Sequence, residues 1–386
     1  PASPVALPSL TLDQALALAA ERSYALSAAR RQAEAADGSV LQAGMLRNPE
    51  LSLSLEDTRR ATRTTTATLA IPLELGGKRA ARVGAAALER ELAQAELGQA
   101  QAELRAAVIE AYFGALVAQQ RLALANDSAV LATRGAQATA RRVAAGKVSP
   151  VDETRALVDQ ANAQLEAAEA AAGLEAARHA LAMLWGDVQP GFGELAGEVE
   201  AVPARPPLAE LASELEASPA LRSSRLQAEH SRALAGVERS RQSPDLTLSV
   251  GAKRDNELGR TQAVIGIAVP LPFFDRNQGA VLQAQKRADQ AGDTHQAARQ
   301  RLLQELQQAI SQLALARNTA LALKSTVLPA AQQALEAAGK GFEAGKFGFL
   351  DVIDGQRTLI HARASYLGAL ATSHQAASAI DRLLGR

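Results

Sequence analysis

The sequence contains no cysteine, few aromatic residues and no long hydrophobic run. The absence of cysteine excludes disulfide scaffolds, thiol nucleophiles and thiolate metal sites. Because no run of about 18 consecutive apolar residues occurs, no transmembrane helix is predicted. A membrane β-barrel is not excluded, since its strands need only about 9–11 residues each and leave a much weaker pattern.

An excess of charge of either sign is also lacking, because 41 Lys and Arg residues balance 41 Asp and Glu residues over 386 positions. A general nucleic-acid binder relies on positive charge to neutralise phosphates, so this class is disfavoured. Hydrophobic residues make up 47% of the chain but aromatic residues only 3%. Most of the non-aromatic hydrophobic residues are alanine. A core of small residues favours helices packed closely along one another.

Motifs for catalysis and for cofactors are missing as well. The five histidines show neither HxxxH nor HExxH spacing, so a surface or packing role is favoured for each. The glycines and lysines between positions 339 and 346 match no phosphate-binding motif, and no G-x-S-x-G element indicates a hydrolase. We therefore predict that the protein is not an enzyme and has no cofactor and no metal site.

The sequence does contain an internal repeat. The segment RNPELSLS at 47–54 returns as QSPDLTLS at 242–249, and three shorter matches follow in the same order at a nearly constant offset. We predict two tandem repeats, at 1–185 and 208–386. A linker rich in proline and glycine is predicted between them, at 186–207.

Within each repeat, short helices are followed by two strands. Apolar residues alternate with Ser or Thr at about 49–57 and 64–74 in the first repeat, and at about 245–253 and 261–270 in the second. This period of two predicts strands with one apolar face and one hydroxyl-bearing face. Each chain is therefore expected to supply four strands.

A very long helix is predicted after each pair of strands. No proline occurs from Gly77 to about Arg142, and about 65 residues at about 1.5 Å each give a helix near 100 Å in length. Asn126-Asp127 is a candidate kink in this helix. The counterpart runs from about Gln278 to Gly341, with Pro329 as its one clear interruption. Helices of this length do not fit a compact globule.

Each long helix ends at a tip, from which a second helix returns. The first tip covers about 143–152, where Gly146 is predicted to end one helix and Ser149 and Pro150 to begin the next. The second tip covers about 342–351. Both tips place lysines and carboxylates near a helix start, and capping together with the helix dipole can account for them without a special function.

The order and spacing of these features resemble the outer membrane factor family, the TolC-like efflux ducts. Each repeat contains four features in the same order: a P-x-L-x-L strand, a strand ending in x-P-L, a long helix, and a tip with an aspartate six positions after a glycine. The segment ELGGKR at 74–79 resembles the CzcC-type branch, which is associated with heavy-metal cation efflux. The resemblance covers essentially the whole chain.

This resemblance implies an α+β, mostly helical duct. Four strands from each of three chains would form a twelve-stranded barrel in the Gram-negative outer membrane, continued by a long α-helical periplasmic barrel. The implied function is a passive channel of a tripartite export system of the resistance-nodulation-division type. The implied cargo is a heavy-metal cation such as cobalt, zinc, cadmium or nickel. A periplasmic adaptor and a proton-driven inner-membrane pump are the implied partners, with outer-membrane lipid around the barrel and no nucleic acid.

Two alternatives remain open from the sequence. The same duct could export drugs or other small molecules. From a different class, a soluble coiled-coil structural protein would explain the alanine-rich helices, but it would not explain alternating strands at the same place in both repeats.

The resemblance also assigns roles to individual residues. The periplasmic gate is expected at the aspartates and cations of the tips, where Phe347 stands in place of a gating arginine and suggests an aromatic constriction. The expected gate residues are Asp152, Asp351, Asp354, Lys147, Lys346 and Phe347. The residues expected to dock the adaptor are Gly146, Val148, Gly345 and Gly348. The strand positions expected to face lipid are Leu51, Leu53, Leu55, Leu246, Leu248 and Val250.

Overall fold

A computed structural model describes residues 9–202 and 204–386 of the chain. Positions 1–8 of the predicted first repeat and position 203 of the predicted linker lie outside the described residues. The chain forms two compact units, and each unit takes segments from both repeats. The hairpin unit contains Pro1–Ala28, Gly98–Ser218 and Arg301–Arg386, and the sheet unit contains Ala29–Leu97 and Pro219–Gln300.

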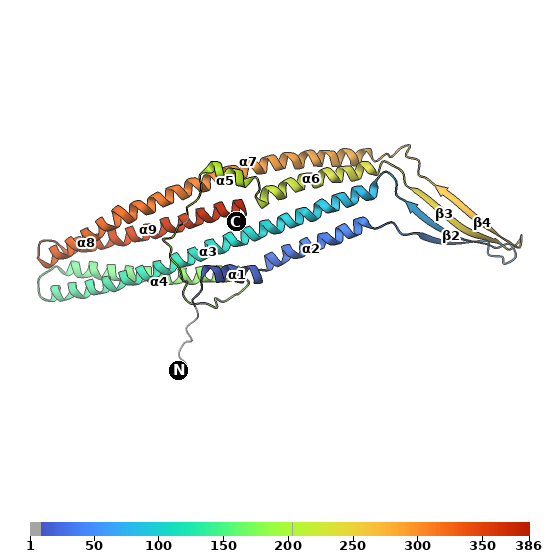
Figure 1. The fold of residues 1–386 in the computed structure, drawn as a ribbon. Helices are drawn as coiled ribbons and strands as arrows, with labels where there is room; N and C mark the ends of the chain where they lie inside the picture. The colour runs from blue at the N-terminus through green and yellow to red at the C-terminus, as the bar shows by residue number, and fades with distance from the viewer. Residues whose placement is uncertain (1–8, 203) are drawn as a thin grey trace. The chain divides into compact units, whose positions relative to one another are not determined.

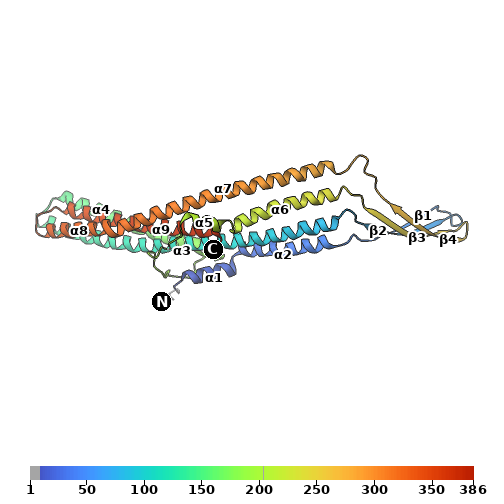
Figure 2. The same cartoon turned by 45° about the horizontal axis from the view of Figure 1, so that its top comes forward.

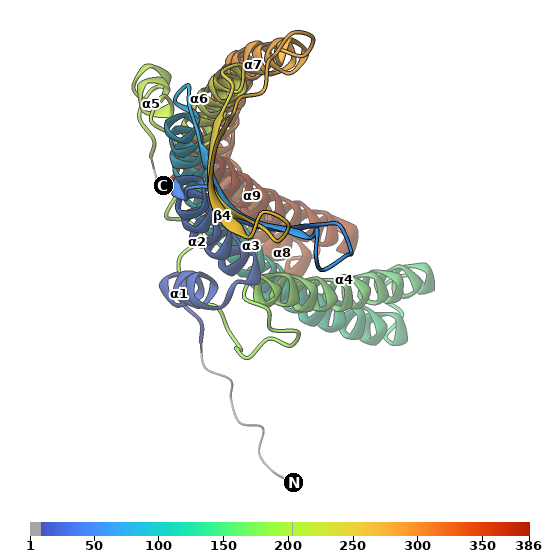
Figure 3. The same cartoon turned by 90° about the vertical axis from the view of Figure 1, so that its right-hand side faces the viewer.

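The sheet unit contains four antiparallel strands in the order β1-β2-β3-β4, and Figure 3 shows them as a curved band. The strands are β1 (Glu50–Glu56), β2 (Thr64–Leu73), β3 (Leu246–Asp255) and β4 (Arg260–Ala268). β2 comes from the first repeat and β3 from the second, and these two strands pair over ten positions. The two repeats therefore share one sheet, which leaves β1 and β4 as its edges.

The register aligns apolar side chains straight across the sheet. Leu51 pairs with Leu69, Leu69 with Val250, and Val250 with Ile265. Because successive residues of a strand point to opposite faces, the neighbouring rows lie on the other face. One of these two neighbouring rows contains Ser52, Thr68 and Gly251. The other contains Ala70, Ser249 and Gly266. The alternation seen in the sequence thus becomes one apolar face and one face of small and hydroxyl-bearing residues.

Hydroxyl groups on this second face hydrogen-bond within the sheet. The Ser52 and Thr68 hydroxyls lie 2.8 Å apart, and the Ser249 hydroxyl donates to the carbonyl of Gly266 at 3.1 Å. At Gly251 a Cβ atom would collide with the Ala67 carbonyl oxygen on β2, so only glycine fits there. This face of the sheet therefore carries small side chains at these positions.

Four helices complete the sheet unit, and they lie side by side in the order α2, α3, α6, α7 (Figures 1 and 2). They are most of α2 (Tyr24–Gly44), the first part of α3 (Lys78–Ala144), α6 (Pro219–Ser240) and the first part of α7 (Gln278–Ala322). Leu92 and Ala95 on α3 pack against Leu226 on α6. Small residues at such contacts let helices approach closely, as the composition predicts.

The hairpin unit contains two helical hairpins and three shorter segments around them. The first hairpin joins the rest of α3 to α4 (Pro150–Met183), and the second joins α8 (Leu328–Glu343) to α9 (Phe349–Leu384). The shorter segments are α1 (Leu12–Arg22), the described residues of the stretch at 186–207, which are 186–202 and 204–207, and α5 (Leu208–Leu215). α3 is helical without a break from Lys78 to Ala144, so Asn126-Asp127 does not interrupt it. No helix in the described part of the chain is long and apolar enough to cross a membrane.

Pro329 changes the second long helix without ending it. α7 ends at Ala322, five residues form a π-helix (Leu323–Val327), and α8 continues from Leu328. A proline has no N–H to donate, and its ring crowds the carbonyl four residues earlier. A wider π-turn at this place relieves that crowding, which is a common cause of helix irregularity.

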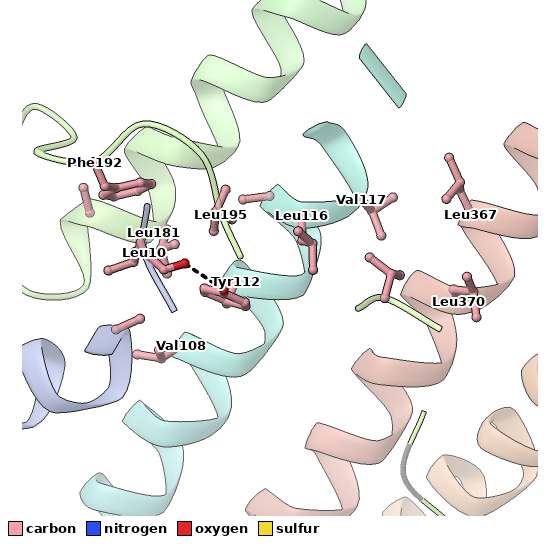
Figure 4. Packing of buried hydrophobic residues seen from close by; sticks show 14 of the residues in the cluster. Leu10, Val108, Tyr112, Leu116, Val117, Leu181, Phe192, Leu195, Leu367 and Leu370 are labelled. Atoms are coloured by element: carbon pink, nitrogen blue, oxygen red, sulfur yellow. Dashed lines mark hydrogen bonds between the residues drawn. The ribbon is translucent and has the colours of Figure 1, made fainter. Parts of the chain in front are cut away.

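The hairpin unit has a core in which chain segments far apart in the sequence meet (Figure 4). Tyr112 on α3 is almost fully buried, and its hydroxyl donates to the carbonyl of Leu10 at 2.9 Å. Leu10 forms a short parallel bridge with Leu195. Phe192 and Val199 are also buried, so the stretch predicted as a linker packs into this core.

Candidate functional site

The first helical tip folds through its own caps. Gly146 has a left-handed backbone (φ 65°) and follows the end of α3 at Ala144. The hydroxyl of Ser149 accepts a hydrogen bond from the N–H of Val151 at 3.2 Å and starts α4, as predicted. Asp152 lies in the first turn of α4, 3.8 Å from the guanidinium of Arg155 on the same helix. The charge of Asp152 is thus partnered locally.

The second tip repeats this arrangement with one difference. Gly345 again has a left-handed backbone (φ 71°), and the N–H of Lys346 donates back to the carbonyl of Gly341 at 2.8 Å. At the start of α9, however, the carboxylate of Asp351 accepts a hydrogen bond from the N–H of Gly348 at 2.7 Å. Asp351 therefore caps its own helix, while Asp354 is exposed one turn later.

Phe347 folds back over its own hairpin. Its side chain is half exposed, and its ring lies so close to Gly341 that any Cβ atom at position 341 would collide with it. Lys147, Lys346 and Gly348 are exposed, and Val148 is half-buried. The predicted gate and docking residues are consequently all at the surface of the two tips or close to it.

In the half of the hairpins towards the tips, the sequence did not predict two contacts that join them. The Nε of Arg357 on α9 lies 3.1 Å from the Oδ1 of Asp159 on α4, and the Nη2 of Arg357 bonds the same oxygen. Nearer the tips, the guanidinium of Arg142 lies 4.1 Å from the centre of the Phe342 ring. Asp159 and Arg357 are 198 residues apart, one position away from the offset of 199 that relates the two tips, so they are not equivalent positions of the repeat.

A small cavity lies beside the Asp159–Arg357 pair. It has a volume of about 220 Å³ and is lined by residues of both hairpins. Leu131 and Ala156 line it from the first hairpin, and Leu335 and Ile353 from the second. The hairpins are thus incompletely packed at the level where the ion pair joins them.

A second charged cluster lies in the sheet unit, where strands meet helices. Glu74 pairs with Arg82 at 2.5 Å and with Arg47 at 3.3 Å, while Asp245 pairs with Lys78 at 2.5 Å. The side chain of Glu74 is only 6% exposed. The Arg82 guanidinium, hydrogen-bonded to Glu74, holds the pKa of that carboxyl below its usual value. The cluster ties the first repeat to the second.

The glycines of the ELGGKR segment explain its shape. Gly76 and Gly77 both have left-handed backbones (φ 69° and 72°), which turn the chain from β2 into α3. At Gly76 there is no room for a side-chain carbon beside Ser243. The segment thus serves as a compact corner whose charged ends, Glu74 and Lys78, bind partners on other segments.

The strand residues predicted to face lipid lie together on the apolar face of the sheet. Leu51, Leu53 and Leu55 are strongly exposed along the edge strand β1. Leu248 and Val250 continue the same face on β3, opposite Ile267 and Ile265 of β4. Leu246 pairs with Leu73 at the end of the ladder. This exposed apolar surface has no covering element within the sheet unit.

No metal centre was found in the described residues, where no three His, Asp or Glu side chains gather in a way that could hold an ion. His374 has the environment of a packing residue. It is buried, its ring stacks on Phe113 at 3.6 Å, and its Nε2 lies 2.6 Å from the carbonyl oxygen of Val199. Burial lowers the pKa of His374, and the buried ring stacked on Phe113 has a packing role.

The chain matches the model of a known protein family. The model of the family described as "Outer membrane efflux protein" matches the chain twice, at residues 15–187 and 211–386. This chain belongs to that family. The double match corresponds to the two repeats found in the sequence, and the four-stranded sheet with two helical hairpins is the fold of this outer membrane efflux protein.

Individual relatives agree with this assignment. The chain is 55% identical to the cobalt-zinc-cadmium resistance protein CzcC of Cupriavidus metallidurans, over 98% of this chain and 90% of that protein. Its fold is similar to that of the outer membrane protein VceC of Vibrio cholerae, with a TM-score of 0.79, 20% identity and coverage of 97% of this chain and 96% of VceC. The CmeC outer membrane channel of Campylobacter jejuni has a TM-score of 0.83 at 15% identity, covering 97% of this chain and 85% of CmeC.

Proposed function

We propose that this outer membrane efflux protein is the passive outer-membrane channel of a tripartite heavy-metal export system. The observation that carries the proposal is the four-stranded sheet with two edges, β1 and β4, and one exposed apolar face. Unpaired strand edges are not tolerated in a bilayer, and a closed barrel removes them. Three chains would supply twelve strands, so we propose a homotrimer in which β4 of one chain pairs with β1 of the next.

The placement of lipid and water follows from the two faces of the sheet. The apolar face would contact the hydrocarbon region, and the face with Ser52, Thr68 and Ser249 would line the water-filled interior. The apolar row on β4 also continues beyond the strand, through the exposed side chains of Val269, Leu271 and Phe273. The polar residues that follow from position 275 would then lie at the periplasmic surface.

The proposed cargo is a divalent heavy-metal cation. Two relatives support this cargo: CzcC is a cobalt-zinc-cadmium resistance protein, and CnrC of Cupriavidus metallidurans, 30% identical, is a nickel and cobalt resistance protein. A conduit needs only weak interaction with what passes through it. The protein would therefore supply a route, and an inner-membrane pump would supply the energy.

The helical tips are the proposed periplasmic end of the channel. Small exposed residues at Gly146 and Gly345 would let a periplasmic adaptor approach closely, with Val148 and Gly348 beside them. The carboxylates and lysines at the tips would form the constriction through which cations pass. Asp354, which is exposed, is the tip carboxylate best placed to act on ions directly.

Metal tolerance of a deletion strain tests the function. Loss of the gene should lower the tolerated concentration of cobalt, zinc or cadmium, and the wild-type gene should restore it. A panel of antibiotics and dyes serves as the comparison. Restored tolerance to drugs but not to metals would reject the metal cargo, and unchanged tolerance to both would reject the efflux function.

A further inference from the structure

The apolar face of the sheet ends in two arginines, Arg63 and Arg254. On β2 the positions that alternate onto this face run from Leu69 towards the β1–β2 turn and reach Arg63 one position before β2 begins. On β3 they run from Val250 and reach Arg254 near the end of the strand. We call Arg63 and Arg254 the rim pair, because both turns of the sheet lie at this end.

The register brings the two residues of the rim pair close together. Arg254 is paired with Thr65 on β2. The N–H of Asn256 donates to the carbonyl of Arg63 at 3.2 Å, so the pairing continues one position beyond β2. Arg63 and Arg254 are thus diagonal neighbours on one face, at a spacing of about 7–8 Å. Two guanidinium groups at this spacing can bind one phosphate group from two sides, or two neighbouring phosphates.

The polar contacts of the rim pair are with neutral groups. Arg254 is exposed, and its Nη1 lies 3.4 Å from the hydroxyl oxygen of Thr261. The Nη2 of Arg63 donates to the carbonyl of Thr58 at 3.0 Å. Within residues 9–202 and 204–386, neither arginine forms an ion pair with a carboxylate. Since a guanidinium has five N–H donors, both groups keep donors available for an anion.

The carboxylates at this end of the strands lie on the opposite face or in the turns. Glu56 and Asp255 are the register partners of Thr64, which alternates onto the opposite face. Asp57 accepts hydrogen bonds within its own turn, and Glu257 lies exposed in the β3–β4 turn. On the apolar face itself, the charge at this end is therefore positive.

We propose that the rim pair binds the phosphate groups of lipopolysaccharide, the phosphorylated glycolipid of the outer leaflet. The proposal rests on the proposed function, in which the apolar face contacts lipid and the helices run into the periplasm. The turns then lie at the outer surface, where acyl chains cover the apolar rows and the sugar phosphates lie level with the rim pair. Arginine suits this role, because its planar guanidinium can form two parallel hydrogen bonds with a phosphate.

Binding of purified lipid A, the phosphorylated lipid part of lipopolysaccharide, tests the site. The purified trimer in mild detergent is titrated with lipid A, and native mass spectrometry counts the bound molecules. The double variant Arg63→Gln/Arg254→Gln should bind about thirtyfold more weakly than wild type, as expected for two cations that contribute about 1 kcal/mol each at a membrane surface. Unchanged affinity would overturn the proposal.

The matched control removes two cations from the opposite face at the same end of the sheet. Lys253 is paired with Thr66, and Arg260 with Asp255, on the face that would line the interior. Lys253→Gln/Arg260→Gln should change the affinity for lipid A by less than about twofold, because water in the interior screens these charges from the lipid. Equal losses in the two double variants would indicate a general attraction of charges and would also overturn the proposal.

A series of lipids identifies the group that is bound. Lipid A without its phosphates should bind to wild type and to the rim-pair variant equally, and phosphatidylglycerol should bind to wild type more weakly than lipid A does. If wild type binds intact and dephosphorylated lipid A equally, phosphate recognition is rejected. If it binds phosphatidylglycerol as tightly as lipid A, the assignment to the glycolipid is rejected.

A conservative variant separates binding from folding. Arg63→Lys/Arg254→Lys keeps both charges but loses the paired hydrogen bonds, so its affinity for lipid A should lie between those of wild type and the glutamine variant. An affinity as low as that of the glutamine variant would contradict the role of charge. A conducting wild-type trimer that does not prefer lipid A would refute the rim pair alone. If the wild-type protein forms no ion-conducting trimer, the proposed function fails instead.

Discussion

Asp351 is a single residue for which capping and gating make different predictions. Its carboxylate accepts a hydrogen bond from the N–H of Gly348, and asparagine could keep that bond while removing the charge. If the charge acts on passing cations, Asp351→Asn and Asp351→Ala should both raise single-channel conductance. If the cap is what matters, only Asp351→Ala should act, with a loss of about 1 kcal/mol in tip stability.

The measurement for Asp351 combines conductance with hydrogen exchange at positions 346–352. Raised conductance with normal exchange in Asp351→Asn would support the gate. If conductance rises only in variants whose hydrogen exchange is also faster, the gate assignment is contradicted. Asp354→Asn is the companion variant, because Asp354 is exposed and its change leaves this cap in place.

Glu74 makes the stability of the protein depend on pH. Its folded pKa lies below the unfolded value because Arg82 hydrogen-bonds the carboxylate. Its contribution is therefore complete above the unfolded pKa of about 4.3 and is lost as the pH falls through the folded pKa. Glu74→Gln should cost about 2 kcal/mol at pH 7, as expected for a buried hydrogen bond between charged groups. The difference from wild type should shrink toward pH 3.

Thermal unfolding followed by circular dichroism at pH 7, 5 and 3 measures this effect. Glu34→Gln is the control, since Glu34 forms an exposed ion pair with Arg31 on α2 and should change stability little. A constant difference between Glu74→Gln and wild type across the pH range would contradict the assignment.

At the scale of elements, adjacent positions of one strand test the two faces of the sheet. Leu69 lies in the apolar row and Thr68 in the hydroxyl row of β2. Leu69→Arg should impair insertion of the trimer by about 2–4 kcal/mol per chain if its side chain meets lipid near the middle of the bilayer. Thr68→Arg should be tolerated, because its side chain would point into water.

The readout for these strand variants is the yield of heat-modifiable trimer in outer-membrane fractions. Equal yields for the two variants would contradict the assignment of faces, and a greater loss for Thr68→Arg would reverse it. Ion conductance of the Thr68→Arg trimer provides a second check, since added positive charge in the interior should reduce cation passage.

Ion pairs join the first repeat to the second. Lys78 of the first repeat binds Asp245 of the second, and Asp159 of the first binds Arg357 of the second. Both contacts join opposite charges that come from different repeats. A duplicated sequence can in this way specify which copy lies beside which.

For the whole molecule, the proposed trimer gives a direct expectation. Light scattering after size exclusion in mild detergent should give a protein mass of about 121 kDa, three times the 40.2 kDa of one chain. Removal of detergent should cause aggregation, because the apolar face would lose its lipid. A stable monomer in buffer without detergent would contradict the barrel.

Much of the fold was predictable because it depends on local periodicity. The four strands follow from a period of two, and the caps at Ser149 and Gly146 follow from residue preferences at helix ends. The predicted gate and lipid-facing residues rested on a resemblance. The ion pair of Asp159 with Arg357 was not predicted, because nothing local at either residue indicates a partner 198 residues away.

The sequence by itself determined the repeat, the strands, the long helices and the family, since each is carried by pattern, order and spacing along the chain. Only the tertiary structure decided the pairing of β2 with β3 across the repeats, the burial of the stretch after Trp185, and the partners of the charged residues. The physical reason is that these contacts join segments far apart in the chain. Their energy depends on which groups burial brings together, and residue types alone do not specify that.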